Sequence, residues 1–232
     1  MNFRVVWNEP EPCPYRPGQV ARLPLRVPER RLTGADLDAQ LALGDRRTGG
    51  LVYVPTCDAC SSCEAIRVDI GRFTPSKSQR RVWNRNVGEL EVAAGPPQVD
   101  DERLLLFNRH KHERGLSRSG EDITQLAYRQ WLVDSCCRTV EVTYRDAGRL
   151  IAVSILDLGE RDASSVYHYF NPDEERRSLG VFSALAEMAW LRQQQFRWYY
   201  LGLYVSDCPA LVYKAGYRPN ERRVGGRWVA GE

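Results

Sequence analysis

Lysine is nearly absent from this chain of 232 residues. Among its 33 lysine and arginine residues, lysine occurs only at Lys77, Lys111 and Lys214. Arginine therefore carries almost all of the positive charge, and its planar fork of donors can bind both oxygens of a carboxylate or phosphate at once. Because a GC-rich genome produces the same excess, the total indicates no particular ligand. The net charge is only +3, so the overall charge does not indicate a polyanionic partner. Only arginines that cluster in the sequence can indicate a binding site.

Long hydrophobic runs are also missing. No stretch approaches the roughly 18 apolar residues of a membrane-spanning helix, and residues 1–10 lack the basic and apolar segments of a secretion signal. We therefore expect a soluble, cytoplasmic protein. Its seven cysteines are odd in number and unevenly spaced, which favours thiols or ligands over a disulfide framework. With 43% hydrophobic and 27% charged residues, the chain can bury a core and is not expected to be disordered.

Residues 1–98 form the first of two predicted units. Six prolines within the first fifty residues predict extended, turning chain with one helix at about 35–43. Short strands are expected at 51–54 and 65–70, on either side of a cysteine loop, and a helix capped by serine is expected over 76–88. The sequence Gly-Pro-Pro at 95–97 then breaks the chain. The first unit is thus a cysteine-loop and basic-helix region.

Residues 99–232 have the pattern of an α+β domain. Helical spacing covers 101–114, and alternating residues before and after a turn at 146–148 predict a hairpin of 139–144 with 150–156. A strand at 165–170, an amphipathic helix at 179–194 and a strand at 197–205 complete the pattern. These elements predict an antiparallel or mixed sheet with flanking helices.

Three cysteines stand close together in the loop of the first unit. Cys57, Cys60 and Cys63 form C-x-x-C-x-x-C, and Cys13 could supply a fourth thiolate. A tight loop of this kind can direct soft ligands at one zinc ion or iron-sulfur cluster. Buried small side chains without a metal fit the pattern nearly as well, and redox-active thiols are a third interpretation. The adjacent Cys136-Cys137 is interpreted as buried packing.

The helix expected at 76–88 is strongly basic. Lys77, Arg81 and Arg85 recur every four residues and form one cationic stripe, while serines line the first turn. A helix start with hydroxyls and cations can bind an anion. A solvated basic face is the ordinary alternative, but Trp83 among the cations also suits a nucleotide.

A third constellation joins a strand, an arginine-rich loop and a helix. Aromatic residues at 167–170 are followed by Arg176-Arg177-Ser178-Leu179-Gly180 and, after the helix, by a second aromatic strand at 198–204. Backbone amides at such a helix start can bind a phosphate or a developing oxyanion. Acyl-CoA N-acetyltransferases use this layout, although an arginine-lined surface alone would give the same pattern.

Together these segments resemble the family of arginyl- and leucyl-tRNA-protein transferases. The resemblance covers nearly the whole chain and rests on several motifs in one order: Cys13-Pro14-Tyr15, the cysteine loop, residues 65–68, residues 73–81, Arg85-Asn86, Phe170-Asn171-Pro172, residues 177–180, Tyr200-Leu201-Gly202, Cys208-Pro209, Tyr213-Lys214 and Tyr217-Arg218-Pro219. It implies an N-acetyltransferase-like (GNAT) transferase domain over 99–232. The short chain is similar to the bacterial branch, which transfers leucine to proteins beginning with aspartate or glutamate and so marks them for degradation by the N-degron pathway.

The implied reaction is attack by the acceptor's α-amine on the ester of an aminoacyl-tRNA. Because that amine has a pKa near ~8 and no Ser-His-Asp set is evident, positioning and oxyanion stabilisation are expected to dominate. Oxyanion or leaving-group assistance is assigned to Tyr169, Tyr200 and the backbone near Gly180. Arg80 and Arg81 are assigned to bind the carboxylate of the acceptor. Lys77, Arg85 and Arg177 are assigned to bind phosphates of the tRNA.

The expected partners are aminoacyl-tRNA and proteins with an acidic N-terminal residue, with neither a membrane nor DNA. The transfer requires no cofactor, so the only cofactor considered is zinc or an iron-sulfur cluster on Cys13, Cys57, Cys60 and Cys63. Three alternatives stay open at this point: an arginyl-tRNA donor, an acetyl-CoA-dependent N-acetyltransferase, and a metal- or redox-responsive RNA-binding module.

The chain departs from the family pattern at three positions, which bear on the donor. This chain has Asn171 where the family commonly has aspartate, Leu203 where it has an aromatic residue, and Ala210 where it has lysine. His110 and His112 match no family motif, and His168 lies on a core strand. We expect His110 and His112 to be exposed on a helix and His168 to be structural.

Overall fold

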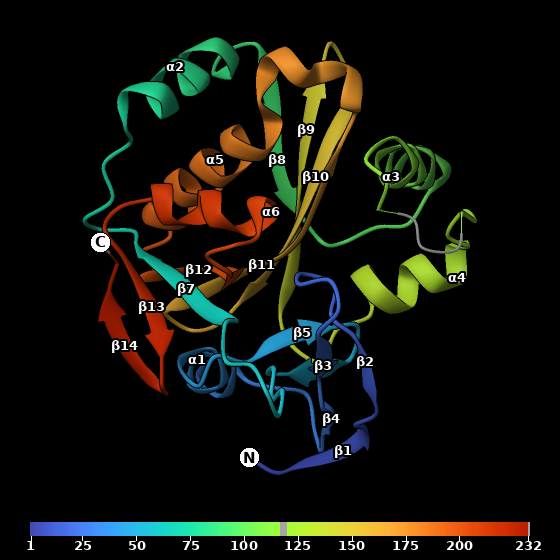
Figure 1. Cartoon of the computed structure of the whole chain (residues 1–232). Helices are drawn as coiled ribbons and strands as arrows, with labels where there is room; N and C mark the ends of the chain where they lie inside the picture. Colours follow the sequence, from blue (N-terminus) through green and yellow to red (C-terminus); the bar gives the residue numbers. More distant parts are fainter. Residues whose placement is uncertain (117–119, 232) are drawn as a thin grey trace.

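The computed structural model describes residues 1–116 and 120–231, which form three β-sheets with helices around the largest (Figure 1). The largest sheet has eight strands in the order β14-β13-β7-β12-β11-β10-β9-β8. In chain order these strands are β7 Glu64–Asp69, β8 Leu90–Gly95, β9 Thr139–Asp146, β10 Arg149–Leu158, β11 Asp162–Phe170, β12 Trp198–Tyr204, β13 Asn220–Val224 and β14 Arg227–Ala230.

Two smaller sheets come from the first fifty-three residues. A four-stranded sheet has the order β1-β4-β6-β5, and β2 pairs with β3 in a separate ribbon. Their bounds are β1 Phe3–Trp7, β2 Pro10–Pro12, β3 Val20–Arg22, β4 Leu25–Pro28, β5 Arg46–Thr48 and β6 Leu51–Tyr53.

The helices begin at side chains that satisfy their first backbone amides. Thr33 and Ser76 each form a capping box with the residue three positions later, and Asp100 caps the next helix. The α-helices are α1 Gly34–Ala42, α2 Lys77–Asn86, α3 Asp101–Glu113, α4 Gln125–Tyr128, α5 Leu179–Gln193 and α6 Pro209–Val212. Short helical turns are η1 Arg129–Val133, η2 Pro172–Arg177 and η3 Tyr213–Gly216. Among the described residues, no helix combines the length and apolar character needed to cross a membrane.

The eight-stranded sheet is covered on both faces. On one face, α5 packs over the largest hydrophobic cluster, and α2 lies outside α5 (Figure 1). On the other face, α3 and α4 cover one cluster, while α1 and the four-stranded sheet cover another. The strands of the core are therefore buried on both sides, as the almost continuous burial of β10 shows.

One strand pair in this sheet differs from all the others. β11 and β12 are parallel, and their register covers only Asp162–Ser164 against Trp198–Tyr200. Beyond these residues no further pairs join the two strands, whereas β12 continues to pair with β7 up to Tyr204. The far half of β12 therefore has a partner on one side only, which leaves its other edge available to side chains from elsewhere.

The elements predicted from periodicity and caps are confirmed. The helices expected at 35–43, 76–88, 101–114 and 179–194 correspond to α1, α2, α3 and α5, and the hairpin corresponds to β9 and β10. The α+β class with a mixed sheet and flanking helices is also confirmed. The division at residues 98 and 99 stays a prediction, and β7 and β8 from the first unit pair within the large sheet.

The predicted exposure of His110 is wrong. This side chain is only 4% exposed, and its Nδ1 lies 3.0 Å from the carbonyl oxygen of Phe170. Burial lowers the His110 pKa to about 4. The other two expectations hold, because His112 is exposed and His168 bonds Ser154 within the sheet at 2.8 Å.

Candidate functional site

Side chains from distant motif segments meet beside the far half of β12. Tyr15 interacts electrostatically with Arg46, Tyr53 and Cys208, and Lys214 interacts with Arg46 and Cys208. We refer to these five residues, Tyr15, Arg46, Tyr53, Cys208 and Lys214, as the Arg46–Lys214 cluster. They come from the N-terminal segment, β5, β6, the loop after β12 and η3.

The position of Arg46 is set by its neighbour on β5. The Nε of Arg47 donates to both oxygens of Asp157 on β10, at 2.9 and 2.7 Å, in a pair that is buried on both sides. This pair holds β5 across the large sheet. Arg46 extends from there to β12, where its guanidinium lies directly against Gly202.

Gly202 is required at this point for two separate reasons. Its φ is +91°, a conformation that side-chain-bearing residues rarely adopt, and it follows a register shift between β12 and β7. In addition, a Cβ at this position would overlap the Arg46 guanidinium. The glycine of the Tyr200-Leu201-Gly202 motif therefore makes room for the arginine.

Lys214 is the second cation of the cluster. Its Nζ donates to the carbonyl oxygen of Leu203 at 2.9 Å. Burial, together with the nearby positive charge of Arg46, lowers the Lys214 pKa to about 7. Within residues 1–116 and 120–231, neither Lys214 nor Arg46 has a carboxylate at ion-pair distance, and the Nε of Arg46 is buried without a hydrogen-bond partner.

Two tyrosines complete the polar surroundings. Burial, and secondarily the neighbouring Tyr53, raises the Tyr15 pKa, so the Tyr15 hydroxyl stays protonated and can donate. The cluster thus combines an arginine, a lysine and phenol groups with no acidic side chain. Donors of this kind stabilise an anion such as a carboxylate or a phosphate.

Tyr200 lies on the same strand but its hydroxyl is already engaged. It accepts a hydrogen bond from Arg67 Nη1 at 2.9 Å and donates to Asp162 Oδ2 at 3.4 Å. Burial raises the pKa of Tyr200 to about 12 and that of Asp162 to about 6. Since Tyr200 is only 3% exposed, its place is in a buried network under α1.

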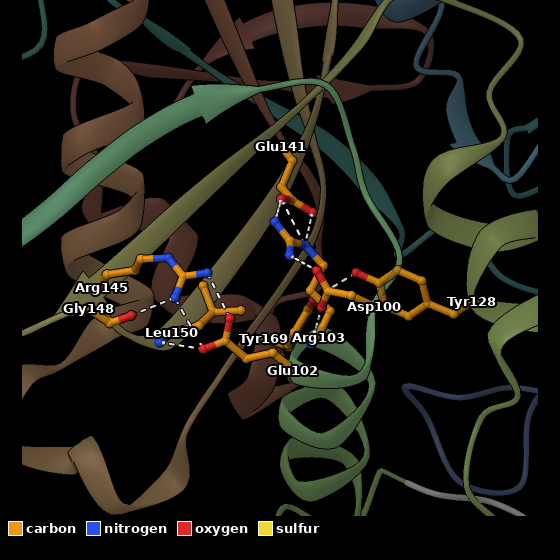
Figure 2. A network of polar contacts seen from close by, with 9 residues as sticks. All are labelled: Asp100, Glu102, Arg103, Tyr128, Glu141, Arg145, Gly148, Leu150 and Tyr169. Carbon is orange, nitrogen blue, oxygen red and sulfur yellow. Dashed lines mark hydrogen bonds and ion pairs between the residues drawn. The ribbon is translucent and has the colours of Figure 1, made fainter.

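Tyr169 lies on the other part of the sheet, beneath α3 and α4 (Figure 2). It is fully buried, and its hydroxyl shares a 2.7 Å hydrogen bond with that of Tyr128. The neighbouring Arg103 donates from Nε to both oxygens of Glu141 at 3.0 Å, as Figure 2 shows. This geometry gives Tyr169 a packing role and no surface that a substrate could touch.

The start of α5 holds Gly180 and follows the arginine-rich loop. The N-cap Ser178 has a φ of 52° and makes no side-chain cap, so its side chain satisfies none of the first amides of α5, and the space above Gly180 is open. Arg177, by contrast, forms ion pairs with Glu89, Asp146 and Glu174 at 2.9 to 3.1 Å. These ion pairs show that Arg177 stabilises this loop.

The four cations assigned on α2 are all exposed, as the predicted stripe requires. Arg80 donates to the carbonyl oxygen of Pro75, and Arg85 donates to that of Arg176. A cavity of about 310 Å³ lies between α2 and α5, walled mainly by apolar side chains with Arg80 and Arg192 beside them. None of the α2 cations belongs to the Arg46–Lys214 cluster, so the structure separates the predicted cations from that site. The exposed cations assigned on α2 are Lys77, Arg80, Arg81 and Arg85.

The cysteine loop lies near the cluster but does not form a metal site in this arrangement. Burial, with Cys57, Cys13 and Cys60 close by, raises the Cys63 pKa to about 11. Two other thiols are hydrogen bonded, because Cys57 accepts from the backbone of Arg22 and Cys60 accepts from Arg16. Across the described residues, no three cysteine, histidine or acidic side chains are grouped so as to hold a metal. The predicted site on Cys13, Cys57, Cys60 and Cys63 is therefore not supported.

Sequence reasoning gave no functional role to any of the five members of the cluster. Arg46 and Tyr53 lie in short strands within a proline-rich segment and match no motif, so no local pattern identified them. Lys214 was part of a quoted motif, but it received no role. Its position as one of only three lysines in an arginine-rich chain is a signal that could have identified it.

Family models match both halves of the chain. A model described as arginine-tRNA-protein transferase, N terminus, matches residues 11–81, and the corresponding C-terminus model matches residues 102–224. Together these ranges contain the cysteine loop, the first half of α2, most of the large sheet and all five residues of the Arg46–Lys214 cluster.

Curated relatives match over nearly their full length. The aspartate/glutamate leucyltransferase of Chromobacterium violaceum is 31% identical over 94% of this chain and 90% of its own. The protein of the same name from Stenotrophomonas maltophilia strain R551-3 is 34% identical over 97% of this chain and 92% of its own. Among solved structures, the C-terminal domain of a putative lysylphosphatidylglycerol synthetase from Agrobacterium fabrum superposes with a TM-score of 0.49 at 18% identity, covering 62% of this chain and 46% of that one.

Proposed function

The chain belongs to the arginine-tRNA-protein transferase family, and we propose that it transfers leucine from leucyl-tRNA to the α-amine of proteins that begin with aspartate or glutamate. As a member of this family it is an aminoacyltransferase. Leucine as the donor and acidic acceptors follow from the names of its full-length relatives. The acetyltransferase and RNA-binding interpretations are set aside because neither accounts for family matches across both halves.

One structural observation carries this proposal: the motif segments of the family converge on one group of side chains. Tyr15 and Lys214 are separated by about two hundred residues, yet both interact with Arg46 beside Gly202 and both interact with Cys208. A shared functional site gives a direct physical reason for that convergence. We place the meeting point of the two substrates at the unpaired edge of β12.

The reaction forms one bond and breaks one. The neutral α-amine of the acceptor attacks the ester carbonyl carbon, an amide bond forms, and the bond from that carbon to the ribose oxygen breaks. The amine loses a proton and the tRNA hydroxyl gains one. Because an α-amine with a pKa near ~8 is partly neutral at physiological pH, correct positioning can supply much of the acceleration.

Binding of the tRNA is assigned to the exposed cations of α2. Lys77, Arg81 and Arg85 present three positive charges along one exposed stripe, and α5, whose N-cap makes no side-chain hydrogen bond, packs beside α2. Phosphate contacts of this kind make affinity fall with salt. The buried hydroxyls of Tyr169 and Tyr200 leave the backbone near Gly180 as the assigned site that is open to an anion.

The biological role follows from the product. A leucine at the N-terminus of a formerly acidic protein would mark that protein for N-degron degradation. We place this reaction in the cytoplasm, where aminoacyl-tRNA is available.

The donor is tested by supplying purified protein with radiolabelled leucyl-tRNA, arginyl-tRNA or acetyl-CoA and a peptide that begins with aspartate. We expect label in the peptide from leucyl-tRNA alone, and ribonuclease treatment of the donor should abolish it. Transfer from arginyl-tRNA alone would show that the protein uses arginyl-tRNA as its donor. Absence of transfer from both charged tRNAs would overturn the proposal.

A further inference from the structure

The buried and half-buried arginines of this protein are in most cases neutralised by carboxylates. Arg47 is paired with Asp157, Arg103 with Glu141, and Arg67 with Glu221. Removing a charge from water is costly unless a counter-charge or hydrogen bonds compensate. Among the described half-buried arginines, Arg22, Arg46 and Arg223 lack a carboxylate at ion-pair distance, and the Nε of each is buried without a hydrogen-bond partner.

Arg46 differs from Arg22 and Arg223 because a second partly buried cation, Lys214, lies beside it. Each is partly buried, each lacks a carboxylate at ion-pair distance among the described residues, and the charge of Arg46 helps to lower the Lys214 pKa. The buried Nε of Arg46 donates no hydrogen bond within the described residues. Lys214 donates one of its three N–H groups to the carbonyl oxygen of Leu203. Two adjacent cations without a neighbouring anion form a site where a bound anion would compensate the positive charge.

The surroundings favour a small carboxylate over a nucleic-acid phosphate. Arg46 lies between β5 and β12, inside the layer that the four-stranded sheet forms over the large sheet. The exposed cations assigned to the tRNA are on α2, on the opposite face, where a polyanionic backbone can reach them. Tyr15 adds a phenol donor to the cluster, and an arginine fork with such donors matches the two oxygens of a carboxylate.

We infer that Arg46 and Lys214 bind the side-chain carboxylate of the acceptor's first residue and thereby select aspartate and glutamate. This inference rests on the proposed function and assigns the selectivity of that reaction to two residues. It replaces Arg80 and Arg81 in the acceptor role. Because that carboxylate is only two or three bonds from the Cα that bears the reacting amine, the inference also locates the reaction beside Gly202.

The experiment compares acceptors that differ only in charge. Peptides beginning with Asp, Asn, Glu or Gln are leucylated by the wild type and by Arg46→Met, Lys214→Met and Lys214→Arg, and kcat/KM is measured for each. The wild type should prefer Asp over Asn by at least about 30-fold. Each Met variant should reduce this ratio to within a few-fold of one, while Lys214→Arg, which keeps the charge, should retain most of it.

A matched control removes an arginine that belongs to no site. Arg109 is exposed on α3 and pairs with Glu113, so Arg109→Met should keep the wild-type ratio. Thermal unfolding of each variant shows whether it is folded. A binding measurement makes the result independent of turnover: a peptide capped with succinate, which is aspartate without its amine, should bind the wild type by titration calorimetry and bind both Met variants at least about 30-fold more weakly.

The possible outcomes separate the inference from the function. If the wild type transfers leucine to no peptide, the proposed function fails. If it transfers with an acidic preference that both Met variants retain, the function stands and the inference is overturned. A higher KM for leucyl-tRNA with an unchanged Asp-to-Asn ratio also overturns it, because the cluster would then bind a tRNA phosphate.

Discussion

The guanidinium of Arg46 packs against the α carbon of Gly202, at a place where any side chain on residue 202 would collide with it. This contact joins β5, which belongs to the N-terminal sheet, to the unpaired edge of β12. It explains why the Tyr200-Leu201-Gly202 motif ends in glycine, since both the backbone conformation and the available space exclude a Cβ.

Gly202→Ala should therefore lower activity more than stability. The positive φ costs roughly 1 to 2 kcal/mol of unfolding free energy, and displacement of Arg46 should reduce kcat/KM for an Asp peptide about tenfold or more. Gly148→Ala is the matched control, because Gly148 has a similar φ of 83° in a hairpin turn with open space around it. Urea unfolding and transfer assays should show equal destabilisation but reduced transfer for Gly202→Ala only. Equal activity of the two variants would contradict the assigned role of this contact.

Binding of the succinyl peptide should weaken as the pH rises. The Lys214 pKa is held near 7 by burial and by Arg46, with Cys208 as the remaining neighbour, so Lys214 loses its charge above that pH. Carboxylate binding, which needs the charge, should weaken roughly tenfold between pH 7 and 8.5. Calorimetric titrations of the wild type and Lys214→Arg measure this, and the arginine variant should show a nearly flat profile. A pH-dependent Arg variant would exclude Lys214 as the titrating group.

The ion pair of Arg103 with Glu141 should contribute strongly to stability because it is buried, at 7% and 3% side-chain exposure (Figure 2). Glu141→Gln leaves the arginine partly unpaired and should lower the free energy of unfolding by about 3 kcal/mol. Glu113→Gln, in the exposed pair with Arg109, should cost less than about 1 kcal/mol. Urea midpoints of both variants test the difference, and similar losses would show that burial is not the deciding factor.

The α2 stripe should set the salt dependence of tRNA binding. Replacing Lys77, Arg81 and Arg85 by glutamine should weaken binding at low salt and reduce the slope of log K against log salt by roughly 2 to 3. Replacing Arg30, an exposed arginine paired with Asp36, should leave the slope unchanged. Filter binding across a salt series measures both, and an unchanged slope in the triple variant would remove α2 from the tRNA site.

Local signals predicted the helices well, because their caps are encoded next to them. Ser76 and Thr33 each begin a helix with a capping box, and the turn at Asp146 defines the hairpin. The N-terminal strands were missed because prolines dominate the local pattern there, while pairing with distant strands determines the structure. His110 was misplaced for a related reason: a helical position facing the sheet cannot be identified when the partner strand is unknown.

The site was predictable only where a motif supplied it. Tyr15, Gly202, Cys208 and Lys214 all lie in segments that resemble the family, but spacing along the chain could not show that they meet. Arg46 becomes significant only beside Gly202, more than one hundred and fifty residues away. Charged clusters such as α2 were visible in the sequence because their members are neighbours in one helix.

The most direct test is leucine transfer by the wild-type protein to two peptides that differ only in a first residue of aspartate or asparagine. With leucyl-tRNA as donor, kcat/KM should be at least about 30-fold higher for the aspartate peptide. Equal transfer to both peptides, or none to either, would contradict it.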